Sequence, residues 1–133
     1  MSKKRTTTIY TDASYTMGNN FGRIAFKING KKVHIKDVKI PKISYLKQYT
    51  NLLELTAVLE ALKYTKAKRV KILTDSQCIR SWVRRTENDL GQFSKFHKQL
   101  KDKTDKRKKE FKHFDIQWVR REENLAGIAL ENI

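Results

Sequence analysis

The chain has 133 residues, and 30 Lys and Arg against 14 Asp and Glu leave a formal net charge of +16. That length fits one domain with a single core, which we place at residues 1–133, and the excess of cations indicates a polyanionic partner. Because no stretch approaches the roughly 18 apolar residues of a membrane span and no basic helix has a bulky apolar face, nucleic acid is favoured over a membrane surface.

The N-terminal part of the chain is patterned as strands. We expect three of them, at 6–11, 22–28 and 31–40. Asn29-Gly30 predicts a type I′ hairpin between the last two, because both central residues of that turn need a positive φ. The apolar residues of the third strand change phase between Ile35 and Val38, which predicts a bulge near Lys36-Asp37.

From residue 51 the hydrophobic period changes to that of helices. We expect helices at 51–64, 76–85, 93–112 and 124–133, strands at 69–74 and 114–119, and a loop at 86–92. A meander of strands followed by alternating helices and strands requires a parallel crossover. The sequence therefore predicts a mixed α/β domain.

Three carboxylates lie where such a sheet presents its working edge. Asp12 ends the first strand, Asp75 ends the fourth, and Glu54 lies in the first turn of the long helix. If the first and fourth strands are parallel neighbours, Asp12 and Asp75 lie side by side, and the helix can bring Glu54 beside them. Grouped carboxylates repel one another, and Mg²⁺ or Mn²⁺ relieves that repulsion. Two such ions about 4 Å apart suit phosphodiester hydrolysis.

Each carboxylate also has a structural explanation. Asp75 before a helix resembles an N-cap, and Asn51 with Glu54 three residues later resembles a capping box. Asp12 can simply end a strand at a turn. Their joint placement in a chain of +16 with this order of elements favours the metal site.

Three short motifs resemble the leading motifs of the ribonuclease H family: Thr11-Asp12-Ala13-Ser14, Thr50-Asn51-x-x-Glu54-Leu55-x-Ala57 and Thr74-Asp75-Ser76-Gln77. Gly22-Arg23-Ile24-Ala25 resembles the segment that follows the first motif in that family. The likeness runs from about Thr8 to Leu130. It implies a five-stranded mixed sheet of order 3-2-1-4-5 flanked by helices.

The resemblance also implies an activity, namely endonucleolytic cutting of the RNA strand of RNA–DNA hybrids with two Mg²⁺ ions, or Mn²⁺ in their place. We expect a monomer whose partner is the hybrid. Two alternatives remain open. One is a catalytically impaired member that only binds nucleic acid, and the other is a related nuclease, such as a resolvase or a reverse-transcriptase-associated domain, on the same fold.

The chain departs from the family at the fourth carboxylate, an Asp in an Ala-Asp pair that opens the last helix after an Asn. Gly127 stands where that Asp is expected. Glu131 lies one helical turn further along the same face, and its longer side chain can reach back toward the metals. Its alternative is a solvated terminus. We take Glu131, with Asp12, Glu54 and Asp75, as catalytic and metal-binding candidates.

Candidate nucleic-acid contacts follow from the resemblance and from charge. The resemblance implies that Asn51 and Gln77 touch the hybrid in its minor groove, although capping or a solvated helix surface explains them as well. Residues 95–113 carry nine Lys and Arg against three acids, which is either a handle for phosphates or a solvated helix face. The full set of candidate contacts is Ser14, Asn51, Gln77, Lys95, Lys98 and Arg120.

The remaining special residues carry little chemistry. The mobile histidine that many family members place before the last helix has no counterpart at 119–123. His34, His97 and His113 show no metal-ligand spacing, and we expect them on the surface. Cys78 stands alone, so the chain cannot form an internal disulfide. No apolar segment follows the basic residues 1–5, so we expect a cytoplasmic protein.

Overall fold

A computed structural model describes residues 5–15, 21–39, 46–84 and 95–132, with side chains except at 46–49 and Lys95. The strands are β1 (Thr7–Tyr15), β2 (Phe21–Ile28), β3 (Val33–Lys39), β4 (Arg69–Thr74) and β5 (His113–Trp118). The helices are α1 (Leu46–Tyr64), α2 (Gln77–Arg84), α3 (Lys95–Lys108) and α4 (Leu125–Glu131), with a 3-10 turn, η1, at Arg121–Glu123.

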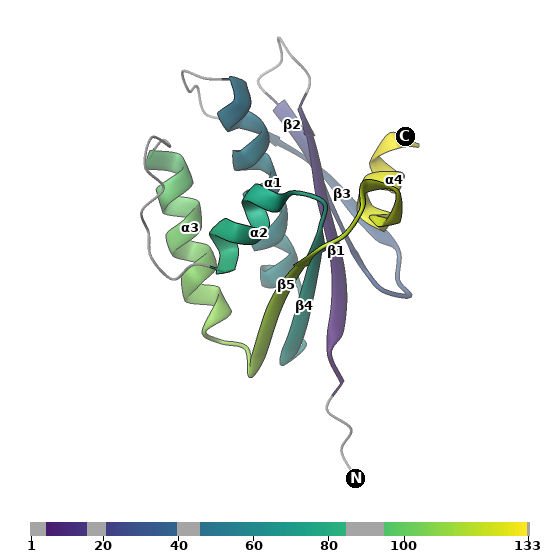
Figure 1. Cartoon of the computed structure of the whole chain (residues 1–133), viewed down its shortest axis with the longest axis vertical. Coiled ribbons are helices and arrows are strands. Elements are labelled where there is room, and N and C mark those ends of the chain that lie inside the picture. The colour runs from purple at the N-terminus through teal and green to yellow at the C-terminus, as the bar shows by residue number, and fades with distance from the viewer. Residues whose placement is uncertain (1–4, 16–20, 40–45, 85–94, 133) are drawn as a thin grey trace.

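The strands form one mixed sheet of order β3-β2-β1-β4-β5. β1 pairs antiparallel with β2, and β2 with β3, whereas the β1–β4 and β4–β5 pairs are parallel. Helices α1, α2 and α3 lie on one side of the sheet and α4 on the other (Figure 1). This arrangement confirms the predicted fold class, strand order and parallel crossover.

The β2–β3 hairpin is confirmed, but its turn type is not the predicted one. Lys31 N donates to Ile28 O at 2.9 Å, and Gly30 has a φ of 81°. No described residue other than glycine has a positive φ, so Asn29 has a negative one, which is the pattern of a type II turn. Asn29 N donates to Thr8 O of β1 at 2.9 Å, so the turn is also bonded to the neighbouring strand.

The predicted bulge in β3 is wrong, because the β2–β3 register runs unbroken through Lys36 and Asp37. The apolar residues change phase because this edge strand carries apolar side chains on both faces of the sheet. Val38 packs against the α1 side of the sheet, while Ile35, which is 36% exposed, lies on the other face beside Ala25. An edge strand can carry apolar side chains on both faces without a bulge, here with Val38 partly buried and Ile35 exposed.

The core lies between the sheet and helices α1 to α3. Its central members are Ile9, Leu55, Val58, Leu62, Ile72, Ile79, Val83 and Ile116. α1 begins five residues earlier than predicted, at Leu46, and α3 ends at Lys108 rather than at residue 112. The expected loop at 86–92 lies outside the described residues. No described helix combines the length and apolar character that a membrane span needs.

Helix α3 turns polar side chains inward as well as outward. Lys101 is fully buried and pairs with Asp105 at 2.5 Å. Arg107 Nε donates to Leu62 O at 2.9 Å, and its Nη2 donates to Thr65 O at 3.1 Å, so this guanidinium satisfies carbonyls at the C-terminal end of α1.

The prediction that His97 lies on the surface is wrong, since this residue is fully buried. The edge of the Trp82 indole meets its ring, with centroids 5.9 Å apart. His34 stacks on Phe26 with ring centroids 4.8 Å apart, and His113 is exposed. A buried histidine was not expected because α3 is so polar in sequence.

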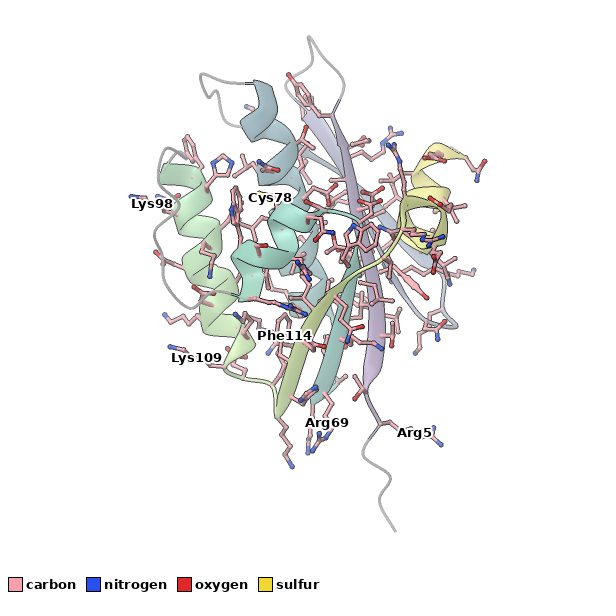
Figure 2. The ribbon with its side chains drawn as sticks, viewed as in Figure 1. Arg5, Arg69, Cys78, Lys98, Lys109 and Phe114 are labelled. Atoms are coloured by element: carbon pink, nitrogen blue, oxygen red, sulfur yellow. The ribbon has the colours of Figure 1, made fainter. Side chains whose placement is uncertain are left out.

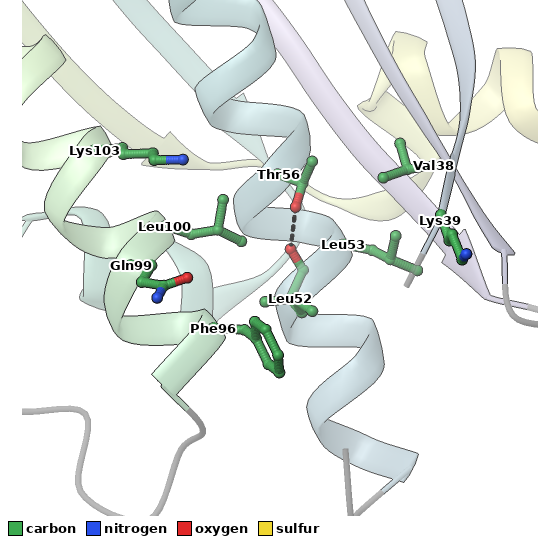
Figure 3. A pocket seen from close by; sticks show the side chains of 9 residues that line it. All are labelled: Val38, Lys39, Leu52, Leu53, Thr56, Phe96, Gln99, Leu100 and Lys103. Carbon is green, nitrogen blue, oxygen red and sulfur yellow. Dashed lines mark hydrogen bonds between the residues drawn. The ribbon is translucent and has the colours of Figure 1, made fainter. Parts of the chain in front are cut away.

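A pocket of about 240 Å³ remains between α1, α3 and β3 (Figure 3). It is lined by Val38, Lys39, Leu52, Leu53, Thr56, Phe96, Gln99, Leu100 and Lys103. Thr56 Oγ1 donates to the backbone at Leu52 O, 2.7 Å away, so that hydroxyl is already satisfied. Among the described residues, none of the individually predicted metal ligands or nucleic-acid contacts lines this pocket, although Lys103 belongs to the basic segment 95–113.

Candidate metal centre

The parallel pairing of β1 and β4 places two of the three carboxylates. Their last paired residues are Thr11 and Thr74, so Asp12 and Asp75 are the next residues of two neighbouring parallel strands. Beyond this point β1 continues only in its ladder with β2, where Asp12 lies opposite Ala25. The β1–β4 ladder therefore ends just before Asp12 and Asp75, and we call this end of the ladder the open edge of the sheet.

The close packing of α1 on β2 brings the third carboxylate to the same place. Leu53 of α1 presses on Gly22 of β2, where a Cβ atom would lie 2.2 Å from Leu53 Cδ1. The absence of a side chain at Gly22 therefore leaves room for the Leu53 side chain in its present position. Glu54, the residue after Leu53, is thereby held at the open edge and is only 5% exposed.

Asp12, Glu54 and Asp75 converge, since each offers a carboxylate oxygen and these oxygens lie within 4.8 Å of one another. Glu54 Oε2 is buried and accepts no hydrogen bond from any described residue. Hard divalent cations prefer carboxylate oxygens as ligands, and a buried carboxylate oxygen without a donor is a ready ligand. The acidic trio therefore fits a Mg²⁺ or Mn²⁺ ion.

The electrostatics of the acidic trio agree with that fit. Burial and the neighbouring Asp12 charge raise the pKa of Glu54 well above its usual value. Burial also raises the pKa values of Asp12 and Asp75. Because its pKa is raised in this way, Glu54 takes up a proton more readily than an ordinary glutamate. A divalent cation that binds here displaces that proton.

The structural alternatives for these residues fail. Ser76 caps α2, because its Oγ accepts from Ile79 N at 3.2 Å, so Asp75 is not the N-cap. Asn51 lies inside α1, which begins at Leu46, so it forms no capping box with Glu54. Neither carboxylate is used to begin a helix.

Asn124 joins the last helix to the trio, a role that was not predicted from the sequence. Its Nδ2 donates to Thr11 O at 2.9 Å, and its Oδ1 caps α4 by accepting from Ala126 N at 3.1 Å. A hydrogen bond from the Asn124 side chain also lowers the pKa of Asp75. An Asn before a predicted helix was the available signal, but it indicates a cap as readily as a site residue.

Gly127, which replaces the expected fourth Asp, lies against the trio. A Cβ atom at this position would be 2.7 Å from Asp12 Oδ2, so any side chain here requires Asp12 to move. Glu131 ends α4 with a side chain that is 61% exposed, and its Oε1 lies 3.5 Å from Arg121 Nε. Its charge contributes to the raised pKa of Asp12, but Glu131 is not part of the group within 4.8 Å.

Arg121 is a second residue near the trio that was not predicted. Its charge lowers the pKa values of both Asp12 and Asp75, partly opposing the effect of burial. It stands in η1, directly before the Asn124 cap, and is largely exposed. Arg121 lies outside the family motifs, and a charged residue in an exposed turn is usually only a solvated side chain, so nothing in the sequence was a reason to select it.

Three of the predicted nucleic-acid contacts lie two or three residues from a member of the trio in the sequence. Asn51 lies three residues before Glu54 on α1 and is partly buried. Gln77 is the first residue of α2 and is exposed, two residues after Asp75. Ser14 is exposed on β1, two residues after Asp12.

The other predicted contacts lie on α3 and next to η1. Lys98 is exposed and points outward from α3 (Figure 2). Arg120 is exposed before η1 and lies 3.9 Å from Glu123. Lys95 begins α3, but its side chain lies outside the described residues.

The chain combines a mixed five-stranded sheet with an acidic trio where two parallel strands end. A model of the RNase H family matches residues 4–127, and the chain belongs to that family. Members of this family depend on metal ions, which agrees with the trio. A comparison with curated protein sequences returned no match.

Solved structures share the fold at low sequence identity. RNase H1 from the halophilic archaeon Halobacterium salinarum NRC-1 is similar with a TM-score of 0.70 and 14% identity, over 97% of this chain and 100% of that one. The N-terminal RNase H domain of Rv2228c from Mycobacterium tuberculosis, solved as a fusion with maltose-binding protein, has a TM-score of 0.70 and 13% identity. That match covers 96% of this chain and 94% of the other.

The raised pKa of Glu54 yields a stability prediction. Because the folded state holds the Glu54 proton more tightly than the unfolded state, the metal-free protein loses stability as pH rises from the ordinary glutamate pKa through the raised one. Glu54→Gln should therefore raise the Tm of the metal-free protein at neutral pH by a few degrees, on the order of 1 kcal/mol, but not at acid pH. Added Mg²⁺ should stabilise the wild type more than the variant.

Thermal unfolding across pH, with and without Mg²⁺, measures both effects. Glu60→Gln is the matched control, because Glu60 lies on the same helix and pairs with Lys36 and Lys63 on the surface. A Glu54→Gln variant that shows the wild-type pH dependence and the wild-type response to Mg²⁺ would contradict the prediction.

Proposed function

We propose that the chain is an endoribonuclease that cuts the RNA strand of RNA–DNA hybrids, with Asp12, Glu54 and Asp75 as catalytic metal ligands. The observation that carries this proposal is the convergence of three carboxylates within 4.8 Å in a chain of the RNase H family with a net charge of +16. Two Mg²⁺ ions, or Mn²⁺ in their place, would activate the attacking water and stabilise the leaving oxygen.

The residues of the trio have distinct parts in this proposal. Glu54 gives up its proton when a cation binds, and its unpartnered Oε2 becomes a ligand. The Asn124 side chain lowers the pKa of Asp75 and so favours its ionised form. The charge of Arg121 favours the ionised forms of Asp12 and Asp75. It also adds positive potential where a phosphate would approach.

The proposed hybrid contacts divide into two regions. Ser14, Asn51 and Gln77 border the trio, where an RNA strand must pass for its phosphate to reach the ions. Arg120 extends this region along η1. Lys95 and Lys98 belong to the phosphate handle on α3. We leave Lys101, Arg107 and Lys108 out of this handle, because Lys101 pairs with Asp105 within α3 and the other two donate to Leu62 O and Val83 O.

A catalytically impaired nucleic-acid-binding protein is the second candidate. Gly127 favours it, because no side chain at that position can contribute a ligand. The retained trio and the unpartnered oxygen of Glu54 favour the enzyme. Hydrolysis assays separate the two.

A labelled RNA–DNA hybrid should be cut in the presence of Mg²⁺ or Mn²⁺, and Asp75→Asn should abolish cutting while folding and hybrid binding stay nearly intact. The substitution removes a charge from the trio but keeps the size of the side chain. Asp37→Asn is the control, because Asp37 pairs with Arg23 on the exposed edge strand. Cleavage is followed by gel electrophoresis, with RNA–RNA and DNA–DNA duplexes alongside.

The outcomes of this assay decide the proposal. A wild-type protein that binds the hybrid without cutting it would favour the impaired candidate. Preferential cutting of DNA–DNA substrates would indicate a related nuclease. Wild-type rates in Asp75→Asn would remove Asp75 from the active site.

We propose further that Glu131 takes the place of the missing fourth carboxylate by reaching the second ion directly or through water. Glu131→Gln should then lower the rate by one to several orders of magnitude at low Mg²⁺, and high Mn²⁺ should partly restore it. Truncation after Leu130 should behave in the same way. Glu122→Gln, a change of the same kind in an exposed residue of η1, serves as the control. Wild-type rates in both Glu131 variants across the metal titration would leave an enzyme of three carboxylates.

Hybrid affinity should fall steeply with salt, and replacing Lys98, Lys103 and Lys106 with Glu should flatten that dependence. Removing one lysine–phosphate pair should reduce the log–log slope by roughly 0.9, because counterions are released wherever a lysine neutralises a phosphate. The three side chains are exposed on α3. The matched control replaces exposed lysines elsewhere, namely Lys31, Lys32 and Lys66. Equal slopes for the two triple variants, measured by fluorescence anisotropy with an inactive protein, would place the handle elsewhere.

A further inference from the structure

Trp118 lies at the open edge of the sheet beside the acidic trio. It is the last residue of β5 and pairs in register with Thr74, the last residue of β4 and the neighbour of Asp75. Its side chain remains 42% exposed, although indole rings carry a large apolar surface. Its position is therefore not explained by burial alone.

The indole of Trp118 holds the backbone of Asp75. Trp118 Nε1 donates to Asp75 O at 3.1 Å, and the next residue, Val119, donates its backbone N–H to Thr74 O at 2.9 Å. Two successive carbonyls at the end of β4 are thus held by two successive residues at the end of β5. The first of these bonds comes from a side chain, so a substitution can remove it without breaking the sheet.

The bond reaches a carbonyl that α2 does not use. The first backbone bond at the start of α2 runs from Arg80 N to Ser76 O at 3.1 Å, one residue after Asp75. The Asp75 peptide therefore lies between the last ladder bond of β4 and the first turn of α2. A fixed carbonyl direction sets the orientation of the peptide plane and with it the direction in which the Asp75 side chain leaves the backbone.

We propose that Trp118 is a positioning residue, whose indole N–H fixes the Asp75 backbone so that the carboxylate points into the acidic trio. This inference rests on the proposed metal site. The backbone of Asp75 is then fixed by Trp118, while the Asn124 side chain acts on its carboxylate by lowering the pKa of that group. Catalytic groups held in this way lose activity when they are displaced by small distances.

The test compares Trp118→Phe, which keeps a ring but removes the N–H, with Gln117→Ala as a matched control. Gln117 is the preceding residue of β5, and its Nε2 donates to Asp115 Oδ2 rather than to the trio. Mn²⁺ binding to each protein is measured by calorimetry, which needs no substrate. Trp118→Phe should bind Mn²⁺ roughly three- to tenfold more weakly, the effect of losing about one hydrogen bond, while Gln117→Ala should match the wild type.

Steady-state kinetics on the hybrid provide a readout that a merely structural role would not change. In Trp118→Phe, kcat should fall with KM nearly unchanged, and excess Mn²⁺ should recover part of the loss. A rise in KM with unchanged Mn²⁺ affinity would instead mean that the ring contacts the substrate, and it would overturn the positioning role. Unchanged Mn²⁺ affinity and unchanged kcat would overturn it as well.

The failure of this proposal can be told from the failure of the proposed function. A wild type that cuts the hybrid, with Mn²⁺ affinity unaffected by Trp118→Phe, rejects the role of Trp118 alone. An inactive wild type whose Mn²⁺ affinity falls in Trp118→Phe rejects the function alone. If Trp118→Phe does not fold, hydrogen exchange of the Trp118 indole proton in the wild type decides, because exchange as fast as in free tryptophan shows that the bond to Asp75 does not persist.

Discussion

The mutual repulsion of Asp12, Glu54 and Asp75 is the constraint on which the rest of the site depends. Holding three carboxylates within 4.8 Å of one another costs free energy, because burial raises the pKa of all three and the Asp12 charge raises those of Glu54 and Asp75 further. The fold sustains the arrangement because each group is fixed by a different element. Two come from the paired ends of β1 and β4, and one comes from a helix that glycine allows to pack closely.

The sheet and the trio could be predicted from sequence because both follow from short-range patterns. Alternating residues and the Asn29-Gly30 pair indicated the strands, the order of elements required a parallel crossover, and the family resemblance implied that β1 and β4 are neighbours. The position of Asp12 and Asp75 at the ends of those strands then follows from topology alone. Glu54 needed only the assumption that α1 packs on the sheet.

The features that sequence did not predict depend on contacts between distant residues. Asn124 meets Thr11 across 113 positions, and Trp118 meets Asp75 across 43. The turn at Asn29 differs from the expected type because its N–H bonds to β1, a partner that the dipeptide does not specify. The inward-facing cations of α3 were not predicted either, because charged residues in a helix are usually solvated and the carbonyls that two of them bind lie outside that helix.

The hydrogen bonds of Arg107 affect how far the exposed lysines of α3 lie from the acidic trio. Its bonds to Leu62 O and Thr65 O tie α3 to the end of α1, the helix that also carries Glu54. The spacing between the exposed lysines of α3 and the acidic trio is therefore set by two packed helices and not by a flexible connection. The shortest duplex that can touch both regions at once is accordingly a fixed property of this fold.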